Sequence, residues 1–131
     1  MIFKRNEGFR FAFEQPLKAS FVILLNGRPA SIERPQVACE VLDISPRGMK
    51  IVTDVDLNDY RGFLVQLELH FLLHMVRMKA IGDIVWAKPL GQKFQYGIFF
   101  NKQSALEDLI IDELKARRKR EVASSKLNRL L

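Results

Sequence analysis

Short runs of alternating apolar and polar residues decide the fold class of this chain. Between residues 65 and 71, apolar side chains at the odd positions alternate with Gln66, Glu68 and His70. A period of two puts successive side chains on opposite faces, which is typical of a β-strand. Runs that are apolar or alternating in this way cover residues 17–25, 37–42, 49–53, 63–73, 75–86 and 94–100. Because no helical pattern separates these six runs, they predict an antiparallel barrel or sandwich.

Turn-forming residues separate the predicted strands. Asn26-Gly27 follows the first run and is a hairpin signal, because both residue types readily adopt a positive φ. Residues 54–62 and 88–93 are rich in polar residues and glycine, so we expect a loop and a turn there. Gly82 lies inside a strand run, where glycine is typical of a bulge or bend.

The pattern becomes helical after residue 103. Ser104 and Glu107 form the S-x-x-E capping box that begins many helices. Acidic residues come early and basic residues late, an order that complements the helix dipole. We therefore predict a helix over residues 104–121, which residues 122–131 either extend or follow as a frayed end, in a fold that is mainly β. Its apolar face consists of Leu106, Leu109, Ile110 and Leu114.

A length of 131 residues fits one domain with its own hydrophobic core. We expect a single domain over residues 1–131, in which 1–16 form a flexible basic N-terminal segment and 17–100 form the barrel. The longest apolar stretch, 63–76, is interrupted by polar residues and is shorter than the roughly 20 residues that cross a bilayer. No membrane insertion is therefore expected. Cys39 is the one cysteine, which excludes an internal disulfide and favours a cytoplasmic location.

The net charge of +6 suggests an anionic partner. Basic residues gather at Lys4, Arg5 and Arg10 and again in the run 115–120. The second run has a structural explanation, because cations stabilise the C-terminal part of a helix. Few aromatic residues stand where bases could stack on the barrel, which argues against a single-stranded nucleic-acid binder. We therefore expect no DNA or RNA partner.

No group of residues predicts catalysis or a metal site. His70 and His74 are four residues apart, a spacing that suits one metal only on a helix, and they lie in or beside a β-patterned run. Cys39 lies in a strand with no histidine nearby in sequence. The acidic loop 54–59 has neither the spacing of a calcium loop nor its bidentate glutamate. We predict neither an enzyme nor a metal-binding protein.

The segment 40–48, EVLDISPRG, carries the most specific signal. Asp43, Ser45 and Gly48 are spaced as D-x-S-x-x-G where a predicted strand ends. Turn chemistry explains such residues, because Asp and Ser accept hydrogen bonds from free backbone N–H groups and Gly supplies a positive φ. Taken alone, the stretch favours this turn interpretation over a ligand site at the strand end.

Together with the basic N-terminal segment, the turn resembles the PilZ domain, the bacterial receptor domain for cyclic di-GMP. That family pairs an R-x-x-x-R motif with a downstream D/N-x-S-x-x-G motif. Asp43, Ser45 and Gly48 complete the downstream motif, and Arg10 matches the second arginine. The order of the strands and the closing helix agree with the family as well, so that the resemblance covers essentially the whole chain.

The first arginine position departs from the family pattern. Asn6 stands there, four residues before Arg10, and Arg5 is one position out of register. We expect Arg5 to take the place of the missing arginine, because the N-terminal segment ahead of the barrel is free to shift. The ligand-binding residues that the resemblance implies are Arg5, Arg10, Asp43, Ser45 and Gly48, with Lys4 and Asn6 as further candidates.

The resemblance implies a six-stranded antiparallel β-barrel with a C-terminal α-helix, and cyclic di-GMP as a ligand with no cofactor. This nucleotide is a dianion with two guanines. A guanidinium meets the O6 and N7 acceptors of guanine in bidentate fashion, binds phosphates and stacks on a purine. The arginines and the Asp-Ser-Gly turn are thus the residue types that such a site needs.

Two functions remain open at this level. The first is a cyclic di-GMP effector that changes shape on binding and signals to a protein partner. Motility or polysaccharide machinery is the partner class that the resemblance suggests. The second is a degenerate PilZ-like adaptor that works by protein contacts and does not bind the nucleotide, for which Asn6 is the motive.

Overall fold

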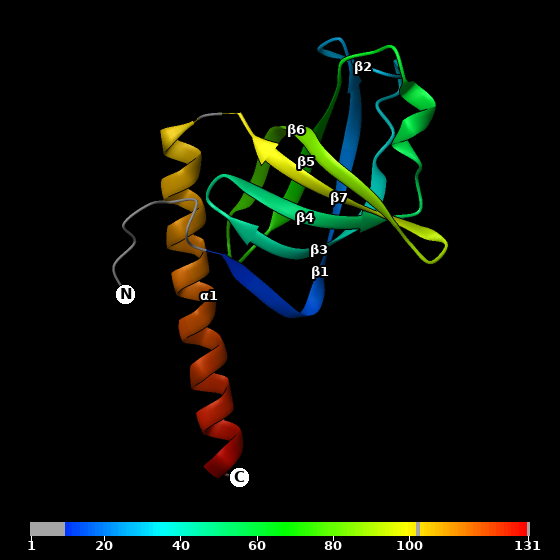
Figure 1. Cartoon of the computed structure of the whole chain (residues 1–131). Helices are drawn as coiled ribbons and strands as arrows, with labels where there is room; N and C mark the ends of the chain where they lie inside the picture. Colours follow the sequence, from blue (N-terminus) through cyan, green and yellow to red (C-terminus); the bar gives the residue numbers. More distant parts are fainter. Residues whose placement is uncertain (1–9, 102, 131) are drawn as a thin grey trace.

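The computed structural model describes residues 10–101 and 103–130, which form a closed β-barrel with one long helix beside it (Figure 1). Six antiparallel strands build the barrel in the order β1, β3, β4, β7, β6, β5, and the pairing of β5 with β1 closes it. The predicted class, mainly β with a six-stranded barrel and a C-terminal helix, is confirmed. The strands are β1 (Phe11–Leu25), β3 (Val37–Ser45), β4 (Gly48–Thr53), β5 (Val65–Leu72), β6 (Arg77–Leu90) and β7 (Lys93–Phe100), with a two-residue β2 (Arg28–Pro29) beside β1.

Strand β1 begins earlier than the sequence pattern predicts, at Phe11 instead of residue 17. Its pairing with β3 is interrupted by a register shift between Ala12 and Leu17. That bulge breaks the alternation of apolar and polar residues, which is why the pattern begins only after it. Residues 11–16 therefore belong to the barrel wall. Phe11 pairs with Ile44 and Ala12 pairs with Asp43, which brings the N-terminal segment to the end of β3.

The connections follow the turn signals with one exception. Asn26 and Gly27 have φ values of 52° and 82°, as a hairpin turn of this kind requires. The predicted loop 54–62 contains a short 3₁₀ helix, η2 (Leu57–Tyr60). The bulge in β6 lies between Ile84 and Trp86, and the expectation of a bulge at Gly82 is wrong. Gly82 lacks room for a side chain, since a Cβ there would lie 2.5 Å from Ile98 Cγ2.

The core fills the inside of the barrel and the space under the helix. Alternate residues of the strands point inward, and side chains such as Phe21, Ile51 and Leu67 are fully buried. Helix α1 (Ser104–Leu130) covers one end of the barrel with Ile110 and Leu114, which are 0% and 1% exposed. None of the described helices is long and apolar enough to cross a membrane.

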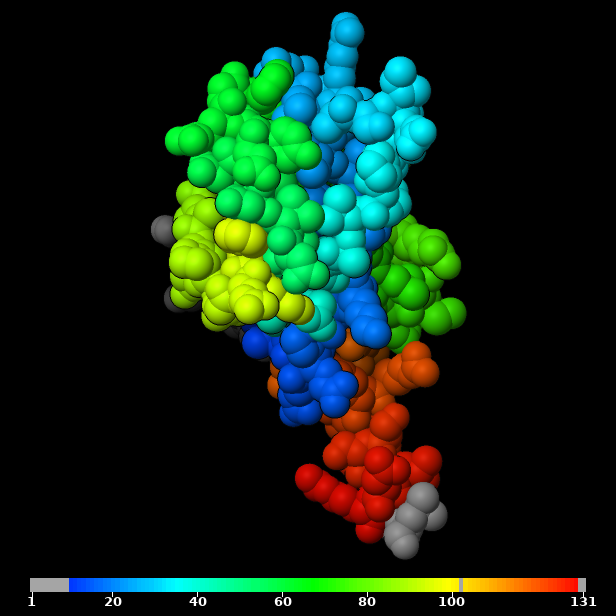
Figure 2. Space-filling view, turned by 90° about the vertical axis from the view of Figure 1, so that its right-hand side faces the viewer, coloured from blue at the N-terminus to red at the C-terminus, as the bar shows by residue number. Residues whose placement is uncertain are grey.

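Only the first half of α1 packs on the barrel. The helix continues past the predicted end at residue 121 as far as Leu130, and residues 118–129 are all exposed. Figures 1 and 2 show this second half projecting well beyond the strands. The basic run at 115–120 is partly structural, because Arg117 donates to the carbonyl of Leu73 at 2.8 Å and stacks over the ring of Phe13.

Glu113 fastens the helix to the β5–β6 turn. Its Oε1 accepts hydrogen bonds from the backbone N–H groups of Met75, at 2.9 Å, and Val76, at 2.7 Å. Burial by itself raises the pKa of Glu113, but these hydrogen bonds, together with His74, outweigh it and hold the pKa below the usual 4.5. The carboxylate is therefore ionised and is part of the folded structure.

Candidate functional site

The D-x-S-x-x-G segment forms a tight hairpin. β3 ends at Ser45, β4 begins at Gly48, and these two residues pair across a two-residue turn, Pro46-Arg47. The buried Ser45 hydroxyl accepts from the Arg47 N–H at 3.3 Å and donates to the Gly48 carbonyl at 3.4 Å. Ser45 thus fixes the shape of the turn, as a serine at such a position does by satisfying nearby backbone groups.

Gly48 is required by close packing of backbone and not by its φ angle. Gly48 is expected either at a positive φ or where backbone packs close to a ligand, and the first alternative is wrong, since Gly48 is not among the described residues with a positive φ. A Cβ at this position would lie 2.2 Å from the carbonyl oxygen of Ile98, on the neighbouring β7. Real Cβ atoms do not approach a backbone oxygen so closely, so any side chain would push β4 and β7 apart.

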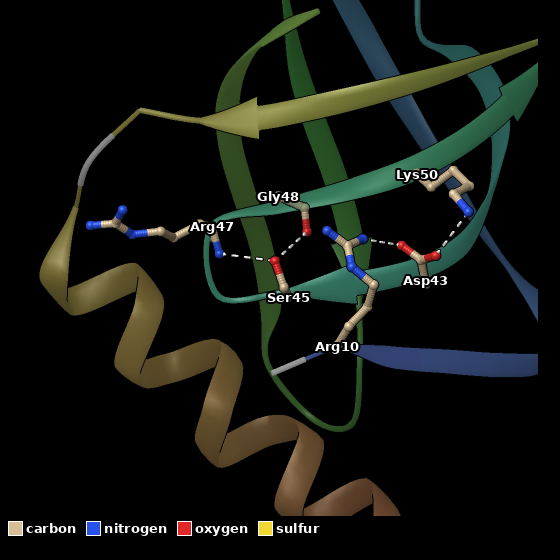
Figure 3. Close-up of polar contacts among 6 residues, drawn as sticks. All are labelled: Arg10, Asp43, Ser45, Arg47, Gly48 and Lys50. Atoms are coloured by element: carbon tan, nitrogen blue, oxygen red, sulfur yellow. Dashed lines mark hydrogen bonds and ion pairs between the residues drawn. The ribbon is translucent and has the colours of Figure 1, made fainter. Parts of the chain in front are cut away.

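Asp43 holds two cations beside this hairpin (Figure 3). Its Oδ1 accepts from Nη1 of Arg10, and its Oδ2 lies 3.4 Å from Nζ of Lys50, the residue paired with it on β4. The Asp43 side chain is 11% exposed, whereas those of Arg10 and Lys50 are 50% and 35% exposed. The carboxylate therefore orients both cations and leaves them accessible to a ligand.

Arg47 connects the hairpin with the helix and with β7. Figure 3 shows its side chain pointing away from Asp43 and toward the first turn of α1. Its Nε lies 3.4 Å from Oε1 of Glu107, the residue predicted to cap the helix, and its carbonyl accepts from the Phe100 N–H at 2.7 Å. A movement of this turn would therefore displace Glu107 and the first turn of α1.

A pocket of about 230 Å³ opens beside the hairpin. Its charged lining comprises three cations (Arg10, Arg47 and Lys50) and one carboxylate, Asp43. The facing wall contributes apolar side chains that are partly exposed, namely Val85, Trp86 and Phe99. A positive, aromatic-walled hollow of this kind suits an anion that also carries flat rings.

The indole of Trp86 lies over Gly97 of the sheet at this pocket. Trp86 pairs with Gly97 on β7 after the β6 bulge, and a Cβ on Gly97 would lie 2.1 Å from Nε1 of Trp86. The absence of a side chain at Gly97 makes room for the indole, which is 40% exposed. An indole held in this way offers a stacking surface beside the cations.

The structure brings four of the predicted site residues together and adds others. Arg10, Asp43, Ser45 and Gly48 all line the pocket, whereas Lys4, Arg5 and Asn6 lie outside the described residues. Among the lining residues that the sequence interpretation missed are Arg47, Lys50 and Trp86. Arg47 lies within the motif and Lys50 follows it by two residues, so both had a local signal. Within the described part of the chain, no three metal-ligating side chains gather.

The fold and the pocket define a β-barrel domain with a cation-lined site at a strand end. The model of the PilZ domain family matches residues 5–116, and the chain belongs to that family. Among solved structures it is similar to the PilZ domain with c-di-GMP of YcgR from Escherichia coli. The two are 14% identical with a TM-score of 0.61 over 88% of this chain and 95% of the other, a likeness that concerns the fold. A comparison with curated proteins found no match.

Proposed function

We propose that this chain binds cyclic di-GMP in the pocket beside the β3–β4 hairpin and passes the binding event to a protein partner. One observation carries the proposal: Asp43 holds Arg10 and Lys50 next to the exposed indole of Trp86 in a domain of the PilZ family. The structurally similar YcgR domain was solved with c-di-GMP.

The pocket matches the chemistry of this ligand group by group. Arg10 can meet guanine O6 and N7 or a phosphate with its guanidinium fork, while Lys50 offers a point charge to a phosphate. Trp86 can stack on one guanine face. Asp43 keeps Arg10 in position, so that part of its side-chain entropy is lost before the ligand arrives.

The residues ahead of Arg10 complete the site in this proposal. Arg5 supplies the second guanidinium, because Asn6 at the family's position has neither the charge nor the fork. Lys4 adds a further charge toward the phosphates. Ser45 and Gly48 act through the hairpin, Ser45 by fixing the turn and Gly48 by permitting the close approach of β7.

Arg47 is the proposed route to the partner. A phosphate in the pocket competes with Glu107 for the Arg47 guanidinium, since phosphate oxygens offer it charged acceptors as a carboxylate does. Movement of Arg47 loosens the first turn of α1. Hydrogen exchange of the amides at 104–110 should therefore accelerate when cyclic di-GMP is added, and unchanged exchange there would remove this route.

A cytoplasmic location and the absence of catalysis are part of the same proposal. Burial raises the pKa of the Cys39 thiol to about 12, with a smaller contribution from the negative charge of Glu40. The thiol is thus protonated and unreactive, which fits a structural cysteine. No catalytic residue is assigned.

The competing function is an adaptor that has lost the nucleotide, and Asn6 favours it. Calorimetric titration of the protein at one fixed salt concentration with cyclic di-GMP, GTP and a short single-stranded oligonucleotide separates the possibilities. The proposal expects saturable binding of cyclic di-GMP alone. No binding of any of the three supports the adaptor, and binding of the oligonucleotide would instead indicate a nucleic-acid function.

A further inference from the structure

Strand β6 has an open edge over its outer half. β5 and β6 pair only as far as Gln66 and Asp83. Beyond Asp83, β6 continues to Leu90 in pairing with β7 alone. Within residues 10–101 and 103–130, no strand pairs with the other edge of residues 84–90. An unpaired edge exposes backbone N–H and C=O groups that an added strand can use.

The opening arises because the chain ahead of β5 follows β1. The N–H of Leu64 donates to Oδ1 of Asn26 at 3.0 Å, and the N–H of Asn26 donates to the carbonyl of Leu64 at 2.9 Å. β6 meanwhile follows β7 into the long hairpin that Figure 1 shows reaching beyond the barrel wall. The two strands therefore separate, and a gap remains between them.

The gap forms a mainly apolar pocket of about 520 Å³. Its lining comes from segment 56–65, which includes η2 and Phe63, and from the β6–β7 hairpin, which contributes Ile84, Ala87 and Phe94. Phe63 is 52% exposed, and Leu90 at the hairpin tip is 48% exposed. On the face drawn in Figure 2, the tip of the β6–β7 hairpin lies directly below segment 54–64.

The charges around the gap are mostly positive. Arg61 and Lys88 line it, and neither forms an ion pair with any described residue. The one carboxylate among the described lining residues, Asp56, accepts a hydrogen bond from the Asn58 N–H at 3.0 Å and caps η2. The lining thus has two cations and one carboxylate, and neither cation forms an ion pair with a described residue.

We propose that this gap docks an extended acidic segment of another protein, which adds to the open edge of β6 as a further strand. Its backbone pairs with residues 84–88, since Pro89 has no N–H and limits pairing beyond them. One apolar side chain enters the pocket opposite Ala87, because residues that face each other across strands lie on the same face. Carboxylates on either side of it meet Lys88 and Arg61.

A second copy of this chain fits the edge less well. Symmetric antiparallel pairing of two β6 edges over residues 84–88 would place Lys88 opposite the apolar Ile84, and each Pro89 would shorten the pairing. Charge complementarity therefore selects a partner with acidic residues. The inference rests on the proposed function in taking the partner to be a protein, but its test uses no nucleotide.

The test begins with random seven-residue peptides displayed on phage and selected on the full chain. We expect enriched sequences that combine an aromatic or branched apolar residue with acidic residues at alternate positions. The enriched peptide is then synthesised, and its Kd is measured by fluorescence polarisation. The Arg10→Ala variant should bind the peptide as the wild type does, because Arg10 does not line this pocket. Peptide binding therefore tests the docking site whether or not the nucleotide proposal holds.

Three variants locate the binding site. Ala87→Trp fills the pocket and should weaken binding about tenfold or more. Lys88→Glu should weaken it about threefold or more. Lys93→Glu is the matched control, because it makes the same charge change at an exposed site on the same hairpin outside the pocket, and it should have little effect. Thermal unfolding verifies that each variant is folded.

Backbone methylation tests strand addition without any change to the protein. Two versions of the peptide carry N-methyl groups on alternate amides, one on the odd positions and one on the even. A peptide paired along one edge tolerates methylation of the amides that point outward and loses binding when the others are methylated. Equal binding of both versions, or no enrichment over the Ala87→Trp variant, would overturn the proposal. Concentration-dependent dimers that Ala87→Trp abolishes would instead identify a second copy as the occupant.

Discussion

The pocket at the β3–β4 hairpin and the apolar pocket beside β6 lie toward opposite ends of the β4–β7 pairing. Gly48 pairs with Phe99 at the first end, and Thr53 pairs with Phe94 at the second. At the first end, β4 and β7 pack so closely that no Cβ fits at Gly48, and a carboxylate fixes the cations. At the second, strands separate and two cations form no ion pair with any residue that the structure describes. The first region thus offers fixed charged side chains, which suit a small charged ligand. The second offers unpaired backbone N–H and C=O groups, which suit an extended segment.

Two glycines test how tightly each end is packed. Gly48→Val should destabilise the protein by about 3 kcal/mol, because the new side chain meets the Ile98 carbonyl and must separate β4 from β7. Gly91 lies in the β6–β7 turn with a φ of 63° and open space around it, and Asn tolerates such a φ. Gly91→Asn should change stability by less than about 0.5 kcal/mol.

Urea unfolding of the two variants measures both values. Equal losses of stability would show that the hairpin end is no more tightly packed than the open end. The contrast between the two regions would then fail.

The two ends of β6 also differ in how their backbone is held. Ahead of the strand, Glu113 accepts hydrogen bonds from the backbone N–H groups of the β5–β6 turn, whereas the other end has an unpaired edge. Glu113→Gln should lower the free energy of unfolding by about 1–3 kcal/mol at pH 7, since the backbone N–H groups of Met75 and Val76 lose a charged acceptor. The exposed Glu121 serves as the control, and Glu121→Gln should have little effect.

The pH dependence follows from the lowered pKa of Glu113. A carboxylate whose pKa is lower in the folded state contributes stability above its unfolded pKa, near 4.5, and loses it as the pH falls through the folded value. The difference between wild type and Glu113→Gln should therefore shrink below pH 4.5. A difference that is constant between pH 7 and pH 3 would indicate a packing effect instead.

Aromatic side chains separate the two regions by function. Trp86→Ala should weaken cyclic di-GMP binding by about 1–3 kcal/mol, the usual contribution of a base stacked on an aromatic ring. Phe63→Ala, at the open edge, should leave the nucleotide affinity unchanged. Calorimetric titration compares the two. Equal losses in both variants would mean that the effect is general destabilisation and that Trp86 is no stacking surface.

The smallest effect is expected at Asn6. If Arg5 fills the vacant arginine position, Asn6→Arg should change the Kd less than about threefold, whereas Arg5→Ala should weaken binding as much as Arg10→Ala does. A tightening of tenfold or more in Asn6→Arg would identify a weakened receptor in which Arg5 does not substitute. Full binding by Arg5→Ala would exclude Arg5 from the site.

Much of the fold could be predicted from the period of the sequence. All six strands alternate or are apolar enough to be recognised, and the switch to a helical period marks α1. The start of β1 could not be predicted, because the bulge around Pro16 interrupts the alternation of apolar and polar residues. The full length of α1 could not either, since residues 118–129 bury no apolar face from which a helical pattern could be read.

The hairpin site was predictable because its residues are close in sequence, and the rest was not. Asp43, Ser45 and Gly48 lie within six residues of one another, and a two-residue turn fixes their arrangement. Trp86 reaches the pocket through the β6 bulge and the glycine at 97, which depend on strand register. The open edge of β6 depends on where β5–β6 pairing ends, and no residue type at that point predicts the end of the pairing.

The central claim is that Arg10, oriented by Asp43, binds the nucleotide. Arg28→Ala is the matched control, since Arg28 is an exposed arginine on β2 outside the pocket. Calorimetric titration with cyclic di-GMP should give a Kd about 10- to 150-fold weaker for Arg10→Ala than for the wild type, and an unchanged Kd for Arg28→Ala. Thermal stability should differ little among the three. Wild-type affinity in Arg10→Ala together with a lower Tm would contradict the claim and make the Arg10–Asp43 pair purely structural.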